Sequence, residues 1–170
     1  LKDFGLVIEN REYQSFHIPG GQSYRGGQYR VEGDYSQLAF FAVAGVIGSE
    51  PITCLGLKED SLQGDKVIIE FLRSMGARVE ELEGGYVFYP SKTKGIVIDS
   101  KECPDLVPAL SVLASLSTGE SWIINGERLK IKESNRLVST STELQKLGAS
   151  SEQKNQETSQ QDDARRTDYV

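Results

Sequence analysis

The sequence predicts a mixed α/β fold made of repeated strand-helix-strand-helix-hairpin (βαβαββ) units, with helices packed on one face of mixed sheets. Two observations support this fold class. Apolar, strand-like runs alternate with helical runs over residues 30–149. A Gly-Ala pair ends a predicted helix at 76–77, and the same pair ends another at 148–149. The spacing between the pairs is longer than most solenoid repeats and suits two copies of a larger unit.

The first complete unit is predicted over residues 30–95. Its elements are a helix rich in small residues, a strand, an amphipathic helix and two short hairpin strands: 36–48, 51–57, 64–76, 77–82 and 86–89. The hairpin is indicated by Gly84 and Gly85, a pair typical of tight turns between strands. Asp65, just after Gly64, is interpreted as a helix-capping residue.

The second unit is predicted over residues 96–149 and is incomplete. It reads as strand, helix, strand and helix, at 95–99, 104–116, 121–125 and about 132–147. The hairpin that should close it is replaced by a tail, residues 150–170, with almost no apolar side chains. A segment of that composition cannot bury enough apolar surface to fold, so we expect it to be disordered.

Composition excludes several classes of function. The net charge of −6 and the pI near 4.9 argue against general binding to nucleic acids or anionic membranes, because both favour a basic surface. No apolar run approaches the roughly 20 residues of a membrane helix. We therefore expect a soluble, cytoplasmic protein. His17 is the only histidine, which leaves neither a multi-histidine metal site nor a histidine triad. No metal or cofactor is predicted.

The most informative chemical pattern is Lys132, Glu133 and Arg136, which directly follows an apolar run. On a helix, Lys132 and Arg136 would lie four residues apart on one face and could clamp a doubly anionic ligand. Glu133 would then be a carboxylate in a positive setting, suited to moving a proton beside that ligand. On spacing alone, the pattern is more typical of the solvated start of an ordinary helix.

Four runs of the sequence resemble the EPSP synthase family, 3-phosphoshikimate 1-carboxyvinyltransferase, in order and spacing. They are VEGDYSQ at 31–37, LQGD at 62–65, CPDLVPAL at 103–110 and IKESNRL at 131–137. The resemblance covers residues 1–149 and implies an enolpyruvyl transferase-like fold of two domains, each with three βαβαββ units. It makes this chain an internal fragment, in which residues 1–29 are the end of the first domain and the crossing, and 30–95 and 96–149 are two units of the second.

The resemblance also implies an activity, the transfer of the enolpyruvyl group of phosphoenolpyruvate to the 5-hydroxyl of shikimate 3-phosphate. Asp105 matches the carboxylate that takes the hydroxyl proton, and Glu133 the proposed proton donor to the methylene carbon. Lys132 matches a shikimate 3-phosphate ligand and Arg136 a phosphoenolpyruvate ligand. Arg128 stands where some members have a substrate-binding asparagine. Glu32 and Asp34 also match family positions, and we interpret them as part of the hinge between the domains.

The resemblance implies small-molecule substrates, no cofactor and a monomeric parent. Substrate residues of the family's first domain have no counterpart here, so the chain alone is expected to be inactive. Two alternatives stay open. One is the sibling UDP-N-acetylglucosamine enolpyruvyl transferase, which the Lys132-Glu133-x-x-Arg136 pattern and the absence of its cysteine-bearing loop disfavour. The other is a non-catalytic repeat module that binds anions or a partner.

Overall fold

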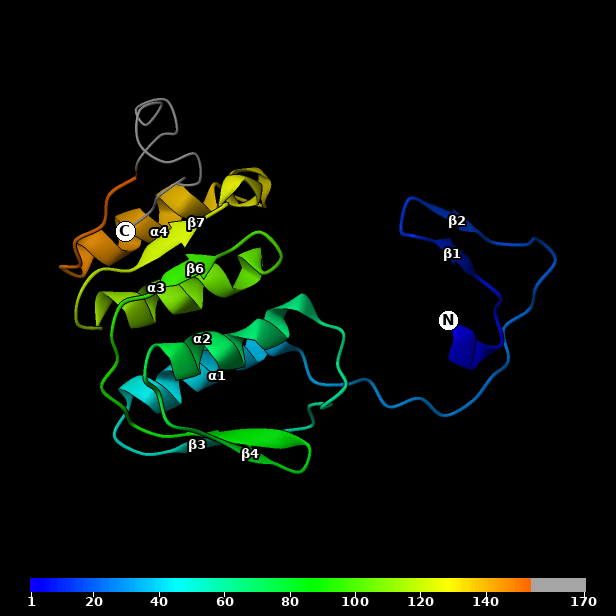
Figure 1. Ribbon diagram of the computed structural model, residues 1–170, viewed down its shortest axis with the longest axis horizontal. Coiled ribbons are helices and arrows are strands. Elements are labelled where there is room, and N and C mark those ends of the chain that lie inside the picture. The colour runs from blue at the N-terminus through cyan, green and yellow to red at the C-terminus, as the bar shows by residue number, and fades with distance from the viewer. Residues whose placement is uncertain (154–170) are drawn as a thin grey trace. The chain divides into compact units, whose positions relative to one another are not determined.

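The computed structural model describes residues 1–153 and divides the chain into two compact units, 1–31 and a second that begins at residue 32 (Figure 1). The first unit contains a 3₁₀ turn at Lys2–Phe4 and an antiparallel hairpin of β1 (Glu9–Arg11) and β2 (Ser15–His17). Every residue of the two strands is exposed.

The second unit opens with the elements of the first predicted repeat, in the order helix, strand, helix, strand, strand. Its elements are α1 (Tyr35–Ile47), β3 (Ile52–Leu55), α2 (Ile68–Ser74), β4 (Val79–Leu82) and β5 (Gly85–Phe88). The strands form one antiparallel sheet in the order β3-β5-β4, and the hairpin turns between Leu82 and Gly85 as predicted. Figure 1 shows α1 and α2 together over this sheet. The predicted helix at 64–76 is a 3₁₀ turn, Gly64–Val67, followed by a shorter α2.

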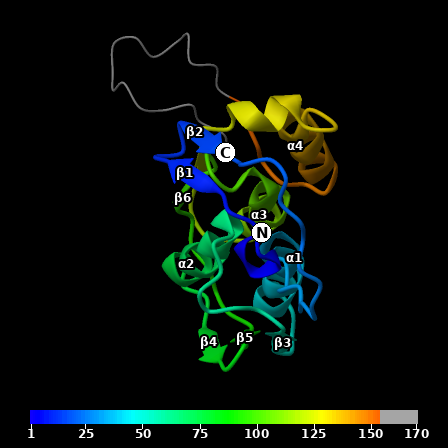
Figure 2. The same ribbon diagram turned by 90° about the vertical axis from the view of Figure 1, so that its right-hand side faces the viewer.

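The remaining elements are β6 (Val97–Asp99), α3 (Val107–Ser115), β7 (Trp122–Ile124) and α4 (Arg136–Lys146). Strands β6 and β7 pair in parallel, with Ile98 opposite Ile123. Helix α3 packs against both α1 and α4, and Figure 2 shows α1 and α3 side by side. The core is continuous through these helices, because Leu106, Leu110 and Leu113 on the α3 side belong to the same buried cluster as α1 and α2. None of the described helices is long and apolar enough to cross a membrane.

The two Gly-Ala pairs that indicate the internal repeat have matching backbone geometry. At the end of α2, Gly76 has φ +96° and the amide of Ala77 donates to the carbonyl of Leu72 at 2.9 Å. At the end of α4, Gly148 has φ +91° and the amide of Ala149 donates to the carbonyl of Leu144 at 3.0 Å. Both ends are the same left-handed glycine cap, and its conformation explains why glycine stands at each place.

Helix α1 begins at a side-chain cap. The carboxylate of Asp34 accepts hydrogen bonds from the amides of Ser36 and Gln37 and from the Ser36 hydroxyl. Those hydrogen bonds, led by the Ser36 hydroxyl, hold the pKa of Asp34 below its ordinary value. An ionised cap of this kind complements the positive end of the helix.

The Asp34→Ala substitution is therefore expected to lower the free energy of unfolding by about 1 kcal/mol. The pKa of Asp34 is lower in the folded chain than in the unfolded chain. The cap therefore stabilises the fold at pH values above the unfolded pKa, and this stabilisation is lost as the pH falls through the folded pKa. Urea unfolding of both proteins at neutral and acidic pH measures this. A loss that is the same at both pH values would show that the Asp34 charge does not stabilise the helix.

Candidate functional site

Asp105 is held at the entrance to α3. It lies in a 3₁₀ turn, Pro104–Leu106, whose first residue is a proline with its backbone angle already set for a helix. The loop before it is fixed from two sides. A β-carbon on Gly64 would lie 2.8 Å from the Glu102 carbonyl oxygen, so this close approach requires glycine. The Cys103 thiol also bonds to the Asp99 carbonyl oxygen at 3.4 Å.

Lys132 and Arg136 do not share a helix face, and this part of the sequence-based prediction is wrong. A 3₁₀ turn at Glu127–Ile131 ends before Lys132, which is extended. Helix α4 starts at Arg136, because the side chain of Asn135 caps it by accepting from the amide of Val138 at 3.3 Å. The asparagine before a helical run was the signal in the sequence for this later start.

The two cations nevertheless meet, at Asp105. Arg136 Nη1 lies 2.5 Å and Lys132 Nζ 3.0 Å from the same oxygen, Asp105 Oδ1. The side chains of Lys132 and Arg136 are 24% and 23% exposed, which makes this a partly desolvated pair of cations. Charges in such a place interact more strongly than on an open surface and are less screened by salt.

Glu133 interacts with the second terminal nitrogen of Arg136. Arg136 Nη2 donates to Glu133 Oε2 at 2.8 Å, so the guanidinium bridges two carboxylates. The Glu133 side chain is 79% exposed. The structure therefore brings together all four predicted site residues, Asp105 and Glu133 with the two cations between them. Arg128 is engaged elsewhere, through a hydrogen bond of 3.1 Å from its Nη1 to the carbonyl oxygen of Lys101.

The cations control the ionisation of the site. Burial raises the pKa of Asp105, but the hydrogen bonds and charges of Lys132 and Arg136 outweigh it and leave the pKa below the ordinary 3.8. The pKa of Glu133 is also lowered, by a hydrogen bond to its own backbone amide and by Arg136. Burial lowers the pKa of Arg136, and the two carboxylates reverse this and raise it. Asp105, Glu133 and Arg136 are therefore charged at neutral pH.

Two further carboxylates have a buried oxygen that the sequence did not predict. Asp65 does not cap a helix, because Gln63 occupies the cap position and makes no side-chain cap bond. Its Oδ1 is buried without a hydrogen-bond partner among the described residues. Burial, together with the charges of Asp105 and Asp34, raises the pKa of Asp65, while Lys132 lowers it. Glu32 Oε2 is buried in the same way as Asp65 Oδ1.

Removing the arginine tests this electrostatic coupling. With Arg136→Gln, the pKa of Asp105 is expected to rise toward its ordinary value, because one of the two cations that favour the carboxylate is gone. Carboxyl-carbon NMR titration of the labelled protein measures it, and Arg128→Gln is the matched control. In the unaltered chain, the ion pairs of Asp105 stabilise the fold at pH values above the unfolded pKa of this carboxyl group. The stabilisation is lost as the pH falls through the lower pKa of the folded state. An unchanged Asp105 pKa would contradict the coupling.

The arrangement is able to bind a multiply charged anion beside an ionised carboxylate. A planar guanidinium suits bidentate recognition of carboxylate or phosphate, and a lysine adds a point charge. Asp105 and Glu133 are positioned to accept or donate protons next to such a ligand. Within residues 1–153, no group of three histidine, cysteine or acidic side chains is placed to hold a metal ion.

Solved structures of enolpyruvyl transferases share this fold. EPSP synthase from Acinetobacter baumannii superposes with a TM-score of 0.68 at 23% identity, over 85% of this chain and 35% of that one. The enolpyruvyl transferase NikO from Streptomyces tendae superposes with a TM-score of 0.57 at 19% identity, over 72% of this chain and 31% of that one. The fold is therefore that of the enolpyruvyl transferases.

The sequence comparisons give the particular family. The family model for EPSP synthase (3-phosphoshikimate 1-carboxyvinyltransferase) matches residues 1–165, and the chain belongs to that family. A 3-phosphoshikimate 1-carboxyvinyltransferase of Clostridium acetobutylicum is 52% identical over 149 residues, which are 88% of this chain. That of Clostridium kluyveri is 49% identical over 149 residues. The chain spans about a third of the length of these relatives, 34% and 35%.

Proposed function

We propose that this chain supplies the carboxylate-and-cation half of an active site that transfers an enolpyruvyl group from phosphoenolpyruvate to the 5-hydroxyl of shikimate 3-phosphate. The observation that carries the proposal is the convergence of Lys132 and Arg136 on Asp105 Oδ1, which belongs to a different turn, far from both in the sequence. Family membership and the names of the relatives supply the substrates.

The reaction moves protons in both of its steps, beside two anionic substrates. Phosphoenolpyruvate takes Arg136 away from Glu133, so the pKa of Glu133 rises and the carboxylate takes up a proton. In the addition step, the 5-hydroxyl oxygen bonds to C2 of phosphoenolpyruvate, its proton passes to Asp105, and Glu133 gives its proton to the methylene carbon. In the elimination step, the bond between C2 and the phosphate oxygen breaks, phosphate leaves with the proton held by Asp105, and the new methyl group returns a proton to Glu133, which regenerates the double bond. Arg136 holds phosphoenolpyruvate, and Lys132 holds shikimate 3-phosphate. Each role uses a group that the structure places in one cluster.

The ionisation of Asp105 fits the role of proton acceptor. In the structure, both cations interact with Asp105 and keep its pKa low, which makes it a weak base. Anionic substrates compete with Asp105 for Lys132 and Arg136. Their binding withdraws positive charge from the carboxylate, so its pKa rises and it becomes a stronger base at the moment when the hydroxyl arrives.

The proposal covers only the part of the active site that this chain supplies. Because the chain spans about a third of its relatives' length, the remaining substrate contacts come from outside residues 1–153. Residues 1–29 would end one domain and form the crossing, and 30–95 and 96–149 would be two units of the next. We expect the 170-residue chain alone to show no turnover, the complete enzyme to be a cytoplasmic monomer, and its partners to be small molecules.

The test is a transplanted segment. Residues 1–149 replace the matching segment of the Clostridium acetobutylicum relative, which is 52% identical, and circular dichroism confirms that the chimera folds. The proposal expects phosphate release that needs both shikimate 3-phosphate and phosphoenolpyruvate. A folded chimera that releases phosphate only when UDP-N-acetylglucosamine replaces shikimate 3-phosphate would favour the sibling enzyme. A folded chimera that releases no phosphate with either acceptor would overturn the proposal that this chain is part of an enzyme.

A further inference from the structure

The side chain of Gln63 holds the segment with which the second unit begins. Its Nε2 donates to the carbonyl oxygen of Gly33 at 2.9 Å, and its Oε1 accepts from the amide of Tyr35 at 2.9 Å. Because a carbonyl oxygen only accepts and an amide N–H only donates, this orientation of the side chain is the one that makes both bonds. Gln63 therefore grips the backbone on both sides of Asp34, the cap of α1.

Two further hydrogen bonds tie the same segment to the loop between β3 and α2. The amide of Gly33 donates to the carbonyl oxygen of Gly56 at 2.7 Å. Tyr35 is fully buried, and its hydroxyl donates to the carbonyl oxygen of Lys58 at 3.1 Å. Gln63 lies at the end of this loop and supplies the other two bonds. The loop and the start of α1 are thus held together as one piece.

The same loop leads directly to the turn that carries Asp105. Gly64, the residue after Gln63, approaches Glu102 so closely that its β-carbon would lie 2.8 Å from the Glu102 carbonyl oxygen. The 3₁₀ turns that begin at Gly64 and at Pro104 both contact α1. Gln63 therefore stands between the first turn of α1 and the turn of Asp105.

Two buried carboxylate oxygens lie beside these contacts. Glu32 Oε2 and Asp65 Oδ1 have no hydrogen-bond partner among the described residues. Glu32 directly precedes Gly33, and Asp65 follows Gln63 by two residues. A buried oxygen without a partner costs free energy and does not hold its own side chain in place. The neighbouring backbone must hold each of them, and Gln63 bonds to that backbone beside Glu32.

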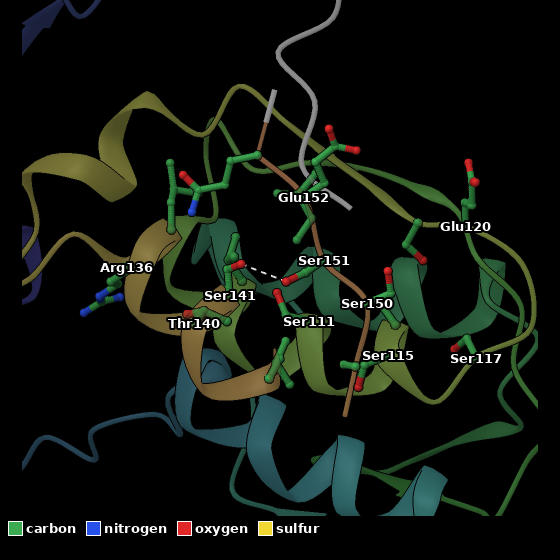
Figure 3. Close-up of a pocket in the computed structure, with 18 of the residues that line it drawn as sticks. Ser111, Ser115, Ser117, Glu120, Arg136, Thr140, Ser141, Ser150, Ser151 and Glu152 are labelled. Atoms are coloured by element: carbon green, nitrogen blue, oxygen red, sulfur yellow. Dashed lines mark hydrogen bonds between the residues drawn. The ribbon is translucent and has the colours of Figure 1, made fainter. Parts of the chain in front are cut away.

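On the side of α4, the turn of Asp105 has less support. A groove of about 380 Å³ lies between α3 and α4, and its lining includes Val107 at the start of α3 and Arg136 at the start of α4. Figure 3 shows Arg136 at one end of this groove. Within α4, only Leu137 is buried. The contacts on the α1 side are therefore the firmer support for Asp105.

We propose that Gln63 is a positioning residue for Asp105. Its bonds to Gly33 and Tyr35 hold the loop between β3 and α2 against the start of α1, and Gly64 passes this constraint to the turn of Asp105. A contiguous set of packed and hydrogen-bonded groups is able to carry such coupling. The meeting of Asp105 with its two cations then depends on a side chain at the start of the second unit. The consequence for catalysis rests on the proposed function of Asp105 as proton acceptor, whereas the geometric coupling does not.

The first test is Gln63→Met in the 170-residue chain, since methionine has a similar length but lacks the amide donor and acceptor. Hydrogen exchange of the Tyr35 amide should become at least ~10-fold faster, because that amide loses its acceptor. The pKa of Asp105 should rise toward its ordinary value as its contacts with the cations loosen. Carboxyl-carbon NMR titration measures the pKa. Gln37→Met, at an exposed glutamine of α1, is the matched control and should show neither change.

A second control separates positioning from general stability. Val46 is 1% exposed near the other end of α1, so Val46→Ala should destabilise the fold and leave the Asp105 pKa unchanged. Faster Tyr35 exchange in Gln63→Met with an unchanged Asp105 pKa would overturn the proposal. So would an equal rise of that pKa in Val46→Ala. If Gln63→Met does not fold, Gln63→Asn is titrated instead, because its shorter amide cannot span both bonds. An unchanged pKa there would equally overturn the proposal.

The effect on catalysis is measured in the chimera with the Clostridium acetobutylicum relative. Gln63→Met should lower the turnover number by ~10-fold and change the KM for phosphoenolpyruvate much less, because a displaced base slows the chemical step. Unaltered turnover in the folded variant would overturn the catalytic part of the inference. A parent chimera without activity would refute the proposed function and leave the coupling to be decided by the titration.

Discussion

Asp105→Asn in the chimera described above is expected to lower the turnover number for phosphate release by ~10²-fold or more. The amide keeps the shape of the side chain but cannot accept the hydroxyl proton, and it removes the negative charge that Lys132 and Arg136 share. A continuous phosphate assay at saturating shikimate 3-phosphate and phosphoenolpyruvate measures it. Asp60→Asn, at an exposed carboxylate, is the matched control and should retain its turnover.

In the same assay, Glu133→Gln tests the role of Glu133 independently of Asp105. We expect a loss of similar size, ~10²-fold, because the amide cannot protonate the methylene carbon. Near-normal turnover in both variants would leave family membership intact and refute the acid-base roles. A loss confined to Asp105→Asn would assign the methylene proton to a group other than Glu133.

The Phe88→Ala substitution is expected to lower the free energy of unfolding of this chain by about 3–5 kcal/mol. Phe88 is fully buried on the middle strand of the β3-β5-β4 sheet, and Gly45 brings α1 directly against it. The backbone of helix and strand is already in close contact there, so the site has little freedom to collapse around the smaller side chain.

Guanidinium unfolding followed by circular dichroism measures this loss. Phe40→Ala is the matched control, since that ring lies on α1 and is 51% exposed. Its effect should stay within about 0.5 kcal/mol, as for most surface substitutions. Similar losses for the two variants would show that the contact between α1 and β5 is not the main support of the core.

The order of elements could be predicted from the sequence because hydrophobic period and glycine caps are local signals. Gly76 and Gly148 indicated the ends of α2 and α4, and Gly84 the turn between β4 and β5. Helix starts were less predictable. A 3₁₀ turn precedes α2, α3 and α4, and propensity does not separate such turns from a first turn of α-helix.

In the site, too, only features with a local signal in the sequence could be predicted. The sequence identified Lys132, Glu133 and Arg136 as a group because they are near neighbours. The prediction that Lys132 and Arg136 share a helix face was wrong, since α4 starts only at Arg136. The place of Asp105 between the two cations depends on the packing of α3 against α4, and nothing local in the sequence specifies it. Only the family resemblance pointed to it. Asp65 was misread as a cap because Gly-Asp before a helix is ordinarily a capping signal.

The uneven burial of the helices fixes an order of unfolding. Helix α1 buries seven of its residues, whereas α4 buries only Leu137. In a chain built from successive repeats, the element with the fewest buried neighbours opens first and at the lowest free energy. Among the helices of the second unit, Arg136 therefore lies on the one expected to open first, while the turn that carries Asp105 is anchored by buried Pro104 and Leu106. Whatever tightens α4 will raise the fraction of molecules in which the two halves of the site are together.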